Sequence, residues 1–408
     1  DDLFSGRGRG KKSVVFLHQR SGKFIKTMQP ALESDSMYED IDACMVDVNN
    51  DGNVDIAVAS GGNEYYENKS YPVPRLYLND GKGNLRKYGV AFDSLFVNAS
   101  CIIPYDFNAD GYEDLFVGGR SVPYRYGEIP ESYLLQNDGS GRFTNVTDRY
   151  NKELSHVGLV TKALWVDLNK DGKKDLLLSL QWGGIIAFIN GKTSFTKRII
   201  TDKQGWWNFI LPVDVNNDGN VDLIAGNLGL NSRLKASEKE PVKLYYSDFD
   251  ENGKKEQILT YHLGGREIPF ANYNELLRQL PRLKKNYLYA ADFAEASSSD
   301  IFSTLTNSEP TVFNASYFSN AVLVNRGDAN FSIDALPWEA QLSSYRDAVI
   351  VNANNDNLPD ILLVGNYYDN NIQMGRYDAD FGTLLLNQNG SFKVEGIAGL
   401  AIKGQVRH

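Results

Sequence analysis

A nine-residue acidic loop constrains this chain more than any other feature. The segment DVNNDGNVD occupies residues 47–55 and returns, with the same internal spacing, as DFNADGYED from Asp106, DLNKDGKKD from Asp167 and DVNNDGNVD from Asp214. In each copy acidic or amide side chains occupy positions 1, 3 and 5, glycine occupies position 6 and aspartate occupies position 9. Oxygen ligands at this spacing suit a hard cation such as Ca²⁺. The sequence therefore predicts a calcium cage in each copy.

The cage is expected to use side-chain oxygens from positions 1, 3, 5 and 9 and the backbone carbonyl of position 7, with glycine permitting the sharp bend at position 6. A diverged fifth copy, DFDENGKKE from Asp248, substitutes glutamate at position 9, so the chain is expected to bind about four to five ions. A weaker sixth copy, NANNDNLPD from Asn352, keeps only Asp356 and Asp360 of the acids. The predicted ligands are Asp47, Asn49, Asp51, Asn53 and Asp55; Asp106, Asn108, Asp110, Tyr112 and Asp114; Asp167, Asn169, Asp171, Lys173 and Asp175; Asp214, Asn216, Asp218, Asn220 and Asp222; and Asp248, Asp250, Asn252 and Glu256.

Two other structures contain loops of similar composition. An EF-hand needs a bidentate glutamate at position 12 and a helix on each side, whereas position 12 here is Val58, Val117, Leu178 or Ala225. The runs after the loops, DIAVAS, DLFVGG, DLLLSL and DLIAGN, are short, apolar and typical of buried strands. A plain turn of Asn, Asp and Gly does not require aspartate at position 9, where a strand begins and aspartate is disfavoured. A strand-loop-strand calcium site is therefore favoured.

A hairpin follows each loop at a variable distance. Apolar runs are paired through Asn-Gly or glycine-rich turns in RLYLNDGKGNL, YLLQNDGSGRF, IAFINGKTSF, VLVNRGDANF and LLLNQNGSF. Each repeat unit then has four strands, and four-stranded units repeated along a chain indicate a β-propeller. The sequence predicts an all-β fold in which residues 1–408 form one seven-bladed β-propeller, with blades at the six loop copies and a seventh blade split between the chain ends.

The split blade is inferred from the alignment of DDLFSGRG at the start of the chain with EDLFVGGR from Glu113. Asp2 then falls at position 9 of a loop whose earlier residues are missing. Residues from about 1–30 and 395–408 are expected to complete one blade, so that the chain begins and ends inside a repeat. Residues 272–305 show helix-like apolar spacing and predict a helical insertion outside the repeat.

Composition excludes several classes of protein. A formal net charge of −10 argues against wholesale nucleic-acid binding, and no apolar run reaches the roughly 18 residues of a membrane span. Cys44 and Cys101 could form a bridge or remain buried thiols, and buried thiols are favoured. Calcium loops of this open kind suit extracellular calcium levels, which indicates an exported protein.

The repeated DxNxDGxxDLxVGG pattern and the LxxNDGxGxF hairpin resemble the FG-GAP/VCBS repeats of integrin-alpha-type β-propellers over nearly the whole chain. The segments GWWNFILPVDVNNDGNVDLIAGNLGLN, PVKLYYSDFDENGK and RYDADFGTLLLNQNGSF are most similar to long bacterial outer-membrane surface proteins of the VCBS/ASPIC-UnbV type. The resemblance implies a binding scaffold at the extracellular or outer-membrane surface of a Gram-negative bacterium, lipid-anchored through an upstream region. It implies no settled enzyme activity.

A binding surface is predicted on the loops between second and third strands, because they are rich in tyrosine and arginine, the residues enriched at interface hot spots. The alternative is that these aromatic side chains fill gaps between blades. The candidate partner-binding residues are Tyr65, Tyr66, Tyr124, Tyr126, Tyr367, Tyr368 and Arg376.

Two functions remain open. The favoured one is a non-catalytic, calcium-stabilised scaffold that binds a protein or glycan at the cell surface. The other is a glycan-active enzyme such as a calcium-dependent polysaccharide lyase, which needs a metal exposed in a groove beside arginine or lysine. No catalytic residue is assigned, because the four histidines are scattered and the clustered carboxylates belong to the predicted cages.

Overall fold

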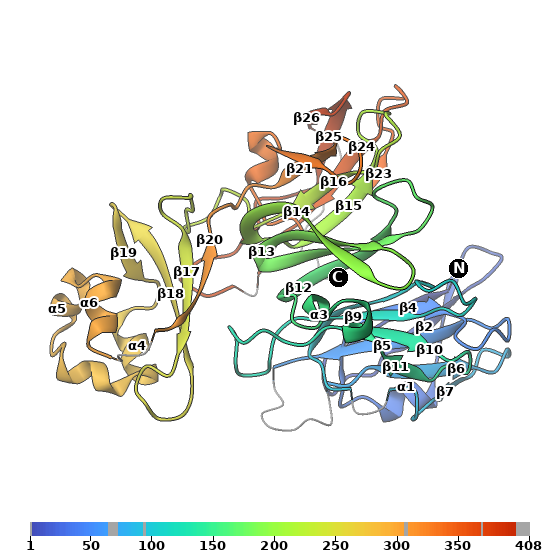
Figure 1. Cartoon of the computed structure of the whole chain (residues 1–408), viewed down its shortest axis with the longest axis horizontal. Coiled ribbons are helices and arrows are strands. Elements are labelled where there is room, and N and C mark those ends of the chain that lie inside the picture. The colour runs from blue at the N-terminus through green and yellow to red at the C-terminus, as the bar shows by residue number, and fades with distance from the viewer. Residues whose placement is uncertain (1, 64–71, 93–94, 306–308, 369, 397–408) are drawn as a thin grey trace.

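The chain folds mostly into antiparallel sheets with few helices, as Figure 1 shows for the whole molecule. This computed structural model describes residues 2–63, 72–92, 95–305, 309–368 and 370–396. The predicted all-β class is confirmed. No helix among these residues is long and apolar enough to cross a membrane.

Six of the seven sheets follow one another as repeat units along the chain. The first sheet has three strands, β1 (Leu3–Ser5), β2 (Val14–His18) and β3 (Phe24–Thr27). The next two are β4 (Glu39–Val46), β5 (Asp55–Gly61), β6 (Arg75–Asn79) and β7 (Leu85–Lys87), then β8 (Ala99–Pro104), β9 (Leu115–Gly119), β10 (Tyr133–Asn137) and β11 (Phe143–Asn145). The last three are β12 (Leu159–Val166), β13 (Asp175–Asn190) and β14 (Phe195–Trp206); β15 (Phe209–Val213), β16 (Asp222–Gly226), β21 (Ala321–Asn325) and β22 (Phe331–Ala335); and β23 (Asp347–Val351), β24 (Asp360–Val364), β25 (Thr383–Gln388) and β26 (Ser391–Glu395).

The remaining sheet has the strand order β19-β18-β17-β20 and is nested inside the β15–β22 unit. Its strands are β17 (Val242–Ser247), β18 (Glu256–Leu263), β19 (Arg266–Pro269) and β20 (Thr311–Ala315). The helices beside it are α4 (Tyr273–Gln279), η1 (Pro281–Lys285), α5 (Ala290–Glu295) and α6 (Ser298–Ser303). Short helices elsewhere are α1 (Pro30–Ser34), α2 (Thr147–Tyr150), α3 (Lys152–Ser155) and η2 (Trp338–Gln341).

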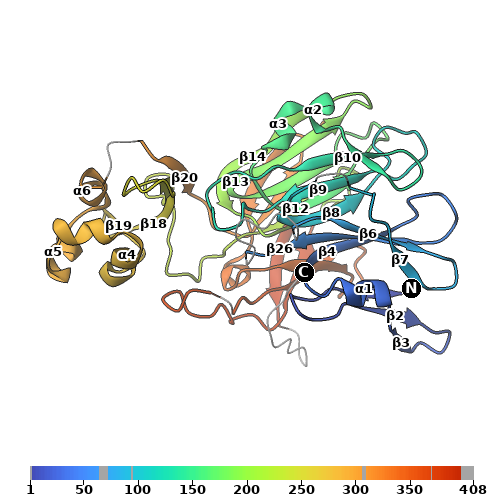
Figure 2. The same cartoon turned by 90° about the horizontal axis from the view of Figure 1, so that it is seen from below.

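The nested sheet corrects the expected order of blades. The prediction that the Asp248 loop opens the next unit in the series is wrong, because β16 pairs with β21, about a hundred residues later, and closes the unit that Asp214 began. The helical insertion predicted at 272–305 is present, but it is part of a larger insertion that includes a whole sheet. Figure 2 shows this module standing to one side of the other sheets.

A second correction concerns the unit that starts at Asp167. As in the other units, the repeat pattern predicts that the second strand ends at glycine, here Gly183, and that a variable loop separates it from the third strand. Instead β13 runs without interruption from Asp175 to Asn190. The pairing with β14 shifts register around Gly183. A side chain at Gly184 would lie 1.9 Å from the Thr201 carbonyl oxygen, so glycine there allows the close approach of the two strands. The second and third strands of this unit are thus fused.

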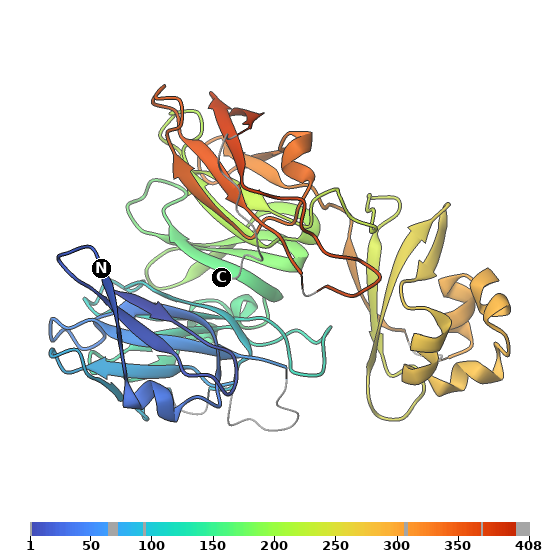
Figure 3. The ribbon, with the colours of Figure 1, turned by 180° about the vertical axis from the view of Figure 1, so that it is seen from behind.

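Successive sheets in the series pack face to face, each through its own hydrophobic cluster. Residue 2 of each loop lies in the cluster shared with the following sheet. These residues are at most 2% exposed, and they are Val48, Phe107, Leu168 and Val215. Figure 3 follows the series from the N-terminal sheets below to the β23–β26 sheet above. Cys44 is partly buried and Cys101 is buried, and neither forms a disulfide, which confirms the preference for buried thiols.

In four sheets of the series an asparagine at or next to the end of the third strand joins neighbouring sheets. We call it the latch asparagine, because its Nδ2 donates to the carbonyl oxygen of loop residue 2 in the preceding sheet. The four pairs are Asn137 to Val48 at 2.8 Å, Asn190 to Phe107 at 3.1 Å, Asn325 to Leu168 at 3.0 Å and Asn387 to Val215 at 2.8 Å. The series of latches passes from the β15–β22 sheet directly to the β23–β26 sheet and bypasses the nested one.

The N-terminal sheet follows the same local geometry. Asp2 Oδ1 accepts a hydrogen bond of 2.9 Å from the His18 amide at the end of β2, the bond that position 9 makes in the other units. This agrees with the alignment of Asp2 with Asp114. The expected pairing with residues 395–408 falls almost wholly on 397–408, which lie outside the described residues.

The latch can be tested at Asn190, which is 1% exposed and also donates to the Lys174 carbonyl. Substituting Asn190→Ala leaves the buried Phe107 carbonyl and the partly buried Lys174 carbonyl without this donor, so the free energy of unfolding should fall by about 2–4 kcal/mol. Asn79 is the matched control, because its Nδ2 contacts only Val54 O of its own sheet. Asn79→Ala should cost about 1 kcal/mol in the same denaturant titration. Equal losses in the two variants would contradict the role of the latch.

Candidate calcium loops and the opposite face

The predicted calcium loops share one backbone conformation. In five of them the carboxylate at position 1 accepts a hydrogen bond of 2.8–2.9 Å from the amide of the glycine at position 6. That glycine has a positive φ, for example +83° at Gly52 and +93° at Gly111, which glycine adopts without strain. In the Asn352 copy Asn357 takes this position at φ +65°, a conformation that asparagine tolerates better than most residues. The loop geometry therefore survives in the copy that lost its glycine.

The acid at position 9 contacts two separate segments. Its first oxygen accepts from the backbone amide of the asparagine at the end of the third strand, as at Asp55 (2.8 Å), Asp175 (2.8 Å) and Asp222 (2.7 Å). Its second oxygen accepts from the amide of loop residue 2, at 3.2, 3.0 and 2.9 Å in the same three units. Asp360 repeats both bonds in the last sheet. This explains why an acid stands at the start of a strand that disfavours it.

Burial leaves these acids electrostatically unfavourable by themselves. Asp114 is 0% exposed, and its burial raises the pKa to about 8. Burial likewise raises the pKa of Asp55, Asp175, Asp222 and Glu256. Removing a carboxylate from water disfavours its charged form unless a positive charge is near. A cation in the loop would offset that cost.

Two buried carboxylate oxygens support the same interpretation. Asp167 Oδ1 and Asp250 Oδ1 have no hydrogen-bond partner. Such oxygens are rare in folded proteins and call for an ion or a water molecule. The oxygen-only donor set fits Ca²⁺ better than a transition metal. The residues present thus fit the cation that the sequence predicts.

Convergence of the acids differs between the loops. Asp248, Asp250 and Glu256 each place one carboxylate oxygen within 4.8 Å of the others. Among the described residues no other three acids meet that distance. The diverged copy in the nested sheet is therefore the tightest acidic cluster in the described part of the chain.

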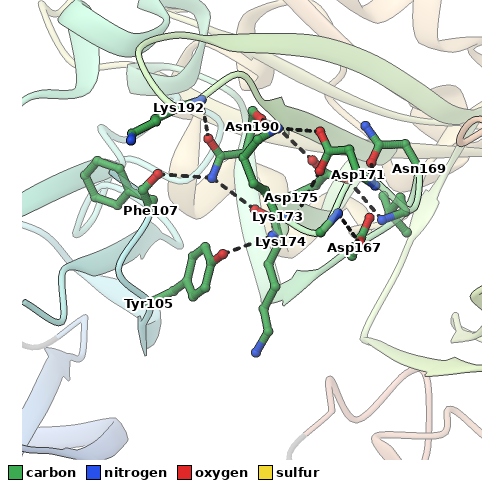
Figure 4. Close-up of polar contacts among 12 residues, drawn as sticks. Tyr105, Phe107, Asp167, Asn169, Asp171, Lys173, Lys174, Asp175, Asn190 and Lys192 are labelled. Carbon is green, nitrogen blue, oxygen red and sulfur yellow. Dashed lines mark hydrogen bonds and ion pairs between the residues drawn. The ribbon is translucent and has the colours of Figure 1, made fainter. Parts of the chain in front are cut away.

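In the loop at Asp167 a lysine side chain of the loop itself lies beside the predicted ligands, as Figure 4 shows. The Lys173 ammonium lies 2.5 Å from Asp171 Oδ2, the position 5 carboxylate, and 3.1 Å from the Asn190 carbonyl oxygen. This ion pair lowers the pKa of Asp171. The lysine at position 7 therefore competes with a metal for one of the predicted ligands.

The candidate partner-binding residues that the structure describes lie at the end of the sheets opposite the loops, and several of them contact other side chains. Tyr65 and Tyr66 lie outside the described residues. Tyr124 is 46% exposed, whereas the Tyr126 hydroxyl accepts a 2.7 Å hydrogen bond from Trp182 Nε1. The structure thus supports the gap-filling alternative for Tyr126 in part.

The other candidates form cation–π pairs. The Arg376 guanidinium lies 5.4 Å from the centre of the Tyr368 ring. Arg346, which the sequence did not single out, lies 4.6 Å from the centre of the Tyr367 ring. Arg346 stands directly before β23 in the run SSYRDAVI. The signal in the sequence was an arginine immediately before the first strand of a unit.

The contribution of the metal can be separated from that of the fold at Asp114. The variant Asp114→Asn removes a buried charge but keeps an acceptor for the Asn137 amide, which now donates at 2.8 Å. With a chelator and at a pH above about 8, where the wild-type carboxylate is charged, its melting temperature should equal or exceed that of the wild type, because the buried charge is gone. Calcium should raise the melting temperature of Asp114→Asn by less than it raises that of the wild type. Asp138→Asn, an exposed hairpin aspartate of the same sheet, should leave the calcium effect unchanged; a full calcium effect in Asp114→Asn would contradict the assignment.

Lys173 offers a test in the opposite direction. Substituting Lys173→Asn places at position 7 the residue that the loops from Asp47 and Asp214 have, and removes the competing ammonium. The calcium-dependent rise in melting temperature should increase relative to the wild type. The neighbouring Lys174→Asn, whose side chain lies over the Tyr105 ring at 5.5 Å, is the control. A smaller calcium effect in Lys173→Asn would show that the lysine assists the loop.

Comparison with known families gives matches to the FG-GAP-like repeat at residues 47–117, 106–178 and 167–225. No curated protein matches the chain significantly. Among solved structures, the V. cholerae biofilm matrix protein Bap1 aligns at 12% identity and a TM-score of 0.33, covering 94% of this chain and 65% of that one. The aligned part is thus under two thirds of Bap1, and the similarity is too low to carry an argument.

The three matched segments overlap in the way the sequence repeats do, since each runs from one acidic loop into the strand after the next loop. The predicted FG-GAP-like repeats are therefore confirmed in the first part of the chain: residues 47–225 consist of three of them.

Proposed function

We propose that this chain is an extracellular, non-catalytic binding scaffold whose FG-GAP units bind calcium and close into a β-propeller. The observation that carries the proposal is the separation of two kinds of residue. Buried acids occupy the loops at one end of the sheets, and tyrosine and arginine occupy the connections at the other end. Calcium at the first end would stabilise the sheets and leave the second end for a protein or glycan.

The propeller geometry is supported by the packing of the series. First strands β4, β8, β12, β15 and β23 lie next to one another in that order. Strands so arranged surround an axis in a propeller. With the nested sheet excluded, the ring would contain six units and not the seven expected from the sequence, and the nested module would project from its side.

A location at the cell surface of a Gram-negative bacterium is the finer part of the proposal. It is supported by the resemblance to bacterial surface proteins and by calcium loops suited to extracellular calcium levels of about 0.1 to 1 mM. The oxygen-only loops would be largely empty at the lower calcium level of a cytosol.

The lyase alternative needs a metal beside arginine or lysine in a groove. The arginines Arg120 and Arg346 lie at the ends of β9 and β23 that are remote from the calcium loops. A strand of five residues separates the two ends by about 17 Å. The loops and these arginines therefore do not form one catalytic site. Incubation with acidic polysaccharides should give no ultraviolet-absorbing unsaturated product, and its appearance would favour the lyase.

Calcium should stabilise the fold by mass action. At a concentration one hundred times its dissociation constant, an ion bound only to the native state adds about 2.7 kcal/mol per site. The melting temperature of the whole chain should therefore rise by several degrees on replacing chelator with millimolar calcium. Magnesium at equal concentration should act more weakly, because it prefers octahedral sites with bound water. A melting temperature that does not respond to calcium would contradict the structural role.

A further inference from the structure

Two arginines from distant parts of the sequence occupy the same end of the sheet series. Arg120 follows β9 directly, and its amide donates to the Asn98 carbonyl at 2.8 Å. Arg346 precedes β23 directly, and its amide donates to the Val364 carbonyl at 2.9 Å. These backbone bonds continue the sheets, so both side chains start from rigid elements.

The surroundings of Arg346 are aromatic and neutral. Its guanidinium lies over the Tyr367 ring, and its Nη1 donates at 3.2 Å to Asn208 Oδ1. Its Nε is buried and has no hydrogen-bond partner. The positive charge is therefore partly desolvated and is met only by dipoles and a π-face.

Arg120 is in the same condition. Its Nη1 is buried without a hydrogen-bond partner, and its charge interacts with the phenol groups of Tyr126 and Tyr367. Tyr367 thus lies near both arginines, and the charge of Arg120 acts on Arg346. Burial lowers the pKa of each guanidinium, and the neighbouring positive charge lowers that of Arg346 further.

No ion pair links either arginine to a carboxylate within the described part of the chain. A buried charge without a partner is strongly unfavourable, and the repulsion that Arg120 exerts on Arg346 adds to the cost. The arrangement is reasonable if an anion from outside the chain completes it. Arginine suits that role because its planar fork binds a carboxylate through two parallel hydrogen bonds.

The groups around the pair have the character of a carbohydrate site. Trp206 is partly buried and packs against Trp182 with ring centres 5.1 Å apart. Trp206 Nε1 and Gln181 Oε1 are a buried donor and a buried acceptor without partners. Tyr126, Trp206 and Tyr367 are partly exposed members of one apolar cluster. Aromatic faces beside unpaired polar atoms match the alternating apolar and hydroxyl surface of a sugar ring.

We propose that Arg120 and Arg346 form a binding site for the carboxylate of a uronic acid within an acidic polysaccharide. The inference rests on the proposed function as a binding scaffold and names its ligand class. A carboxylated sugar fits better than a nucleic acid, because a nucleic-acid site needs a basic stripe of many lysines and arginines, whereas this site offers two arginines in a chain of net charge −10.

The test is isothermal titration of the whole chain, in calcium, with an oligogalacturonide. A neutral oligosaccharide of equal length and free galacturonic acid are the comparison ligands. The oligogalacturonide should bind, the neutral oligosaccharide should not, and the free acid should bind more weakly. Arg120→Gln and Arg346→Gln should each weaken binding by roughly tenfold or more, and Arg346→Lys by less.

The matched control is Arg125→Gln, an arginine of the same loop that is 59% exposed and paired with Glu128. It should leave the affinity within about twofold, because exposed ion pairs contribute little. Without ligand, the melting temperatures of Arg120→Gln and Arg346→Gln should equal or exceed that of the wild type, since an unpaired buried charge is removed. A lower melting temperature would indicate a structural role and overturn the proposal.

Internal pairing is tested separately, because Glu64 and Glu67 belong to a segment outside the described residues. If Glu64→Gln/Glu67→Gln destabilises the wild type but not the Arg120→Gln variant, the arginine has a partner in the chain and the site is overturned. Equal binding of all anions with a steep loss in salt would also overturn it. Neither result affects the calcium-dependent melting that tests the scaffold itself.

Discussion

The carboxylate at position 9 of each loop is the interaction on which the sheet series depends. One buried acid contacts the amide of loop residue 2 and the amide of the latch asparagine, as Asp222 does with Val215 and Asn325. It therefore fixes a loop against both the second and the third strand of its sheet. The same loop residue packs into the next hydrophobic cluster and accepts the next latch, here from Asn387. Loop residue 2, here Val215, thus couples the conformation of its loop to the packing of the following sheet.

This coupling explains how a large module is inserted without interrupting the series. The Asn227 amide donates to Asn320 Oδ1, so the two ends of the insertion are already adjacent. The pairing of β16 with β21 and the latch from Asn325 to Leu168 are then the same as in a unit with a short connection. Because the entropic cost of closing a loop grows slowly with its length, the insertion is tolerated at this point. It also lies at the end of β16 remote from the predicted calcium loop at Asp214.

The elements that depend on nearby residues could be predicted from the sequence, and those that depend on distant pairing could not. The loops, the strand that starts at Asp55 and the hairpin turn after Asn137 follow from local spacing and turn chemistry. The nested sheet was missed because the Asp248 loop is locally the same as its relatives, and only β21 shows where the earlier unit resumes. The latch could not be derived, since Asn190 and Phe107 are 83 residues apart and each also has a local role. Arg346 was missed because it matters only as the neighbour of Arg120, and no pattern in the sequence shows that the two residues approach each other in the fold.

The two ends of each strand are subject to different constraints, and this bears on function. At the loop end, position 9, residue 2 and the latch asparagine must match one another across neighbouring sheets, so a change in one unit affects the next. At the other end, the connections after β9, β16 and β24 have no such shared bond among the described residues and differ in length and composition. Arg120, for example, directly follows the end of β9 there, where a side chain can change without disturbing the latches. A fold that concentrates its cooperative contacts at one end leaves the opposite face able to specialise in binding.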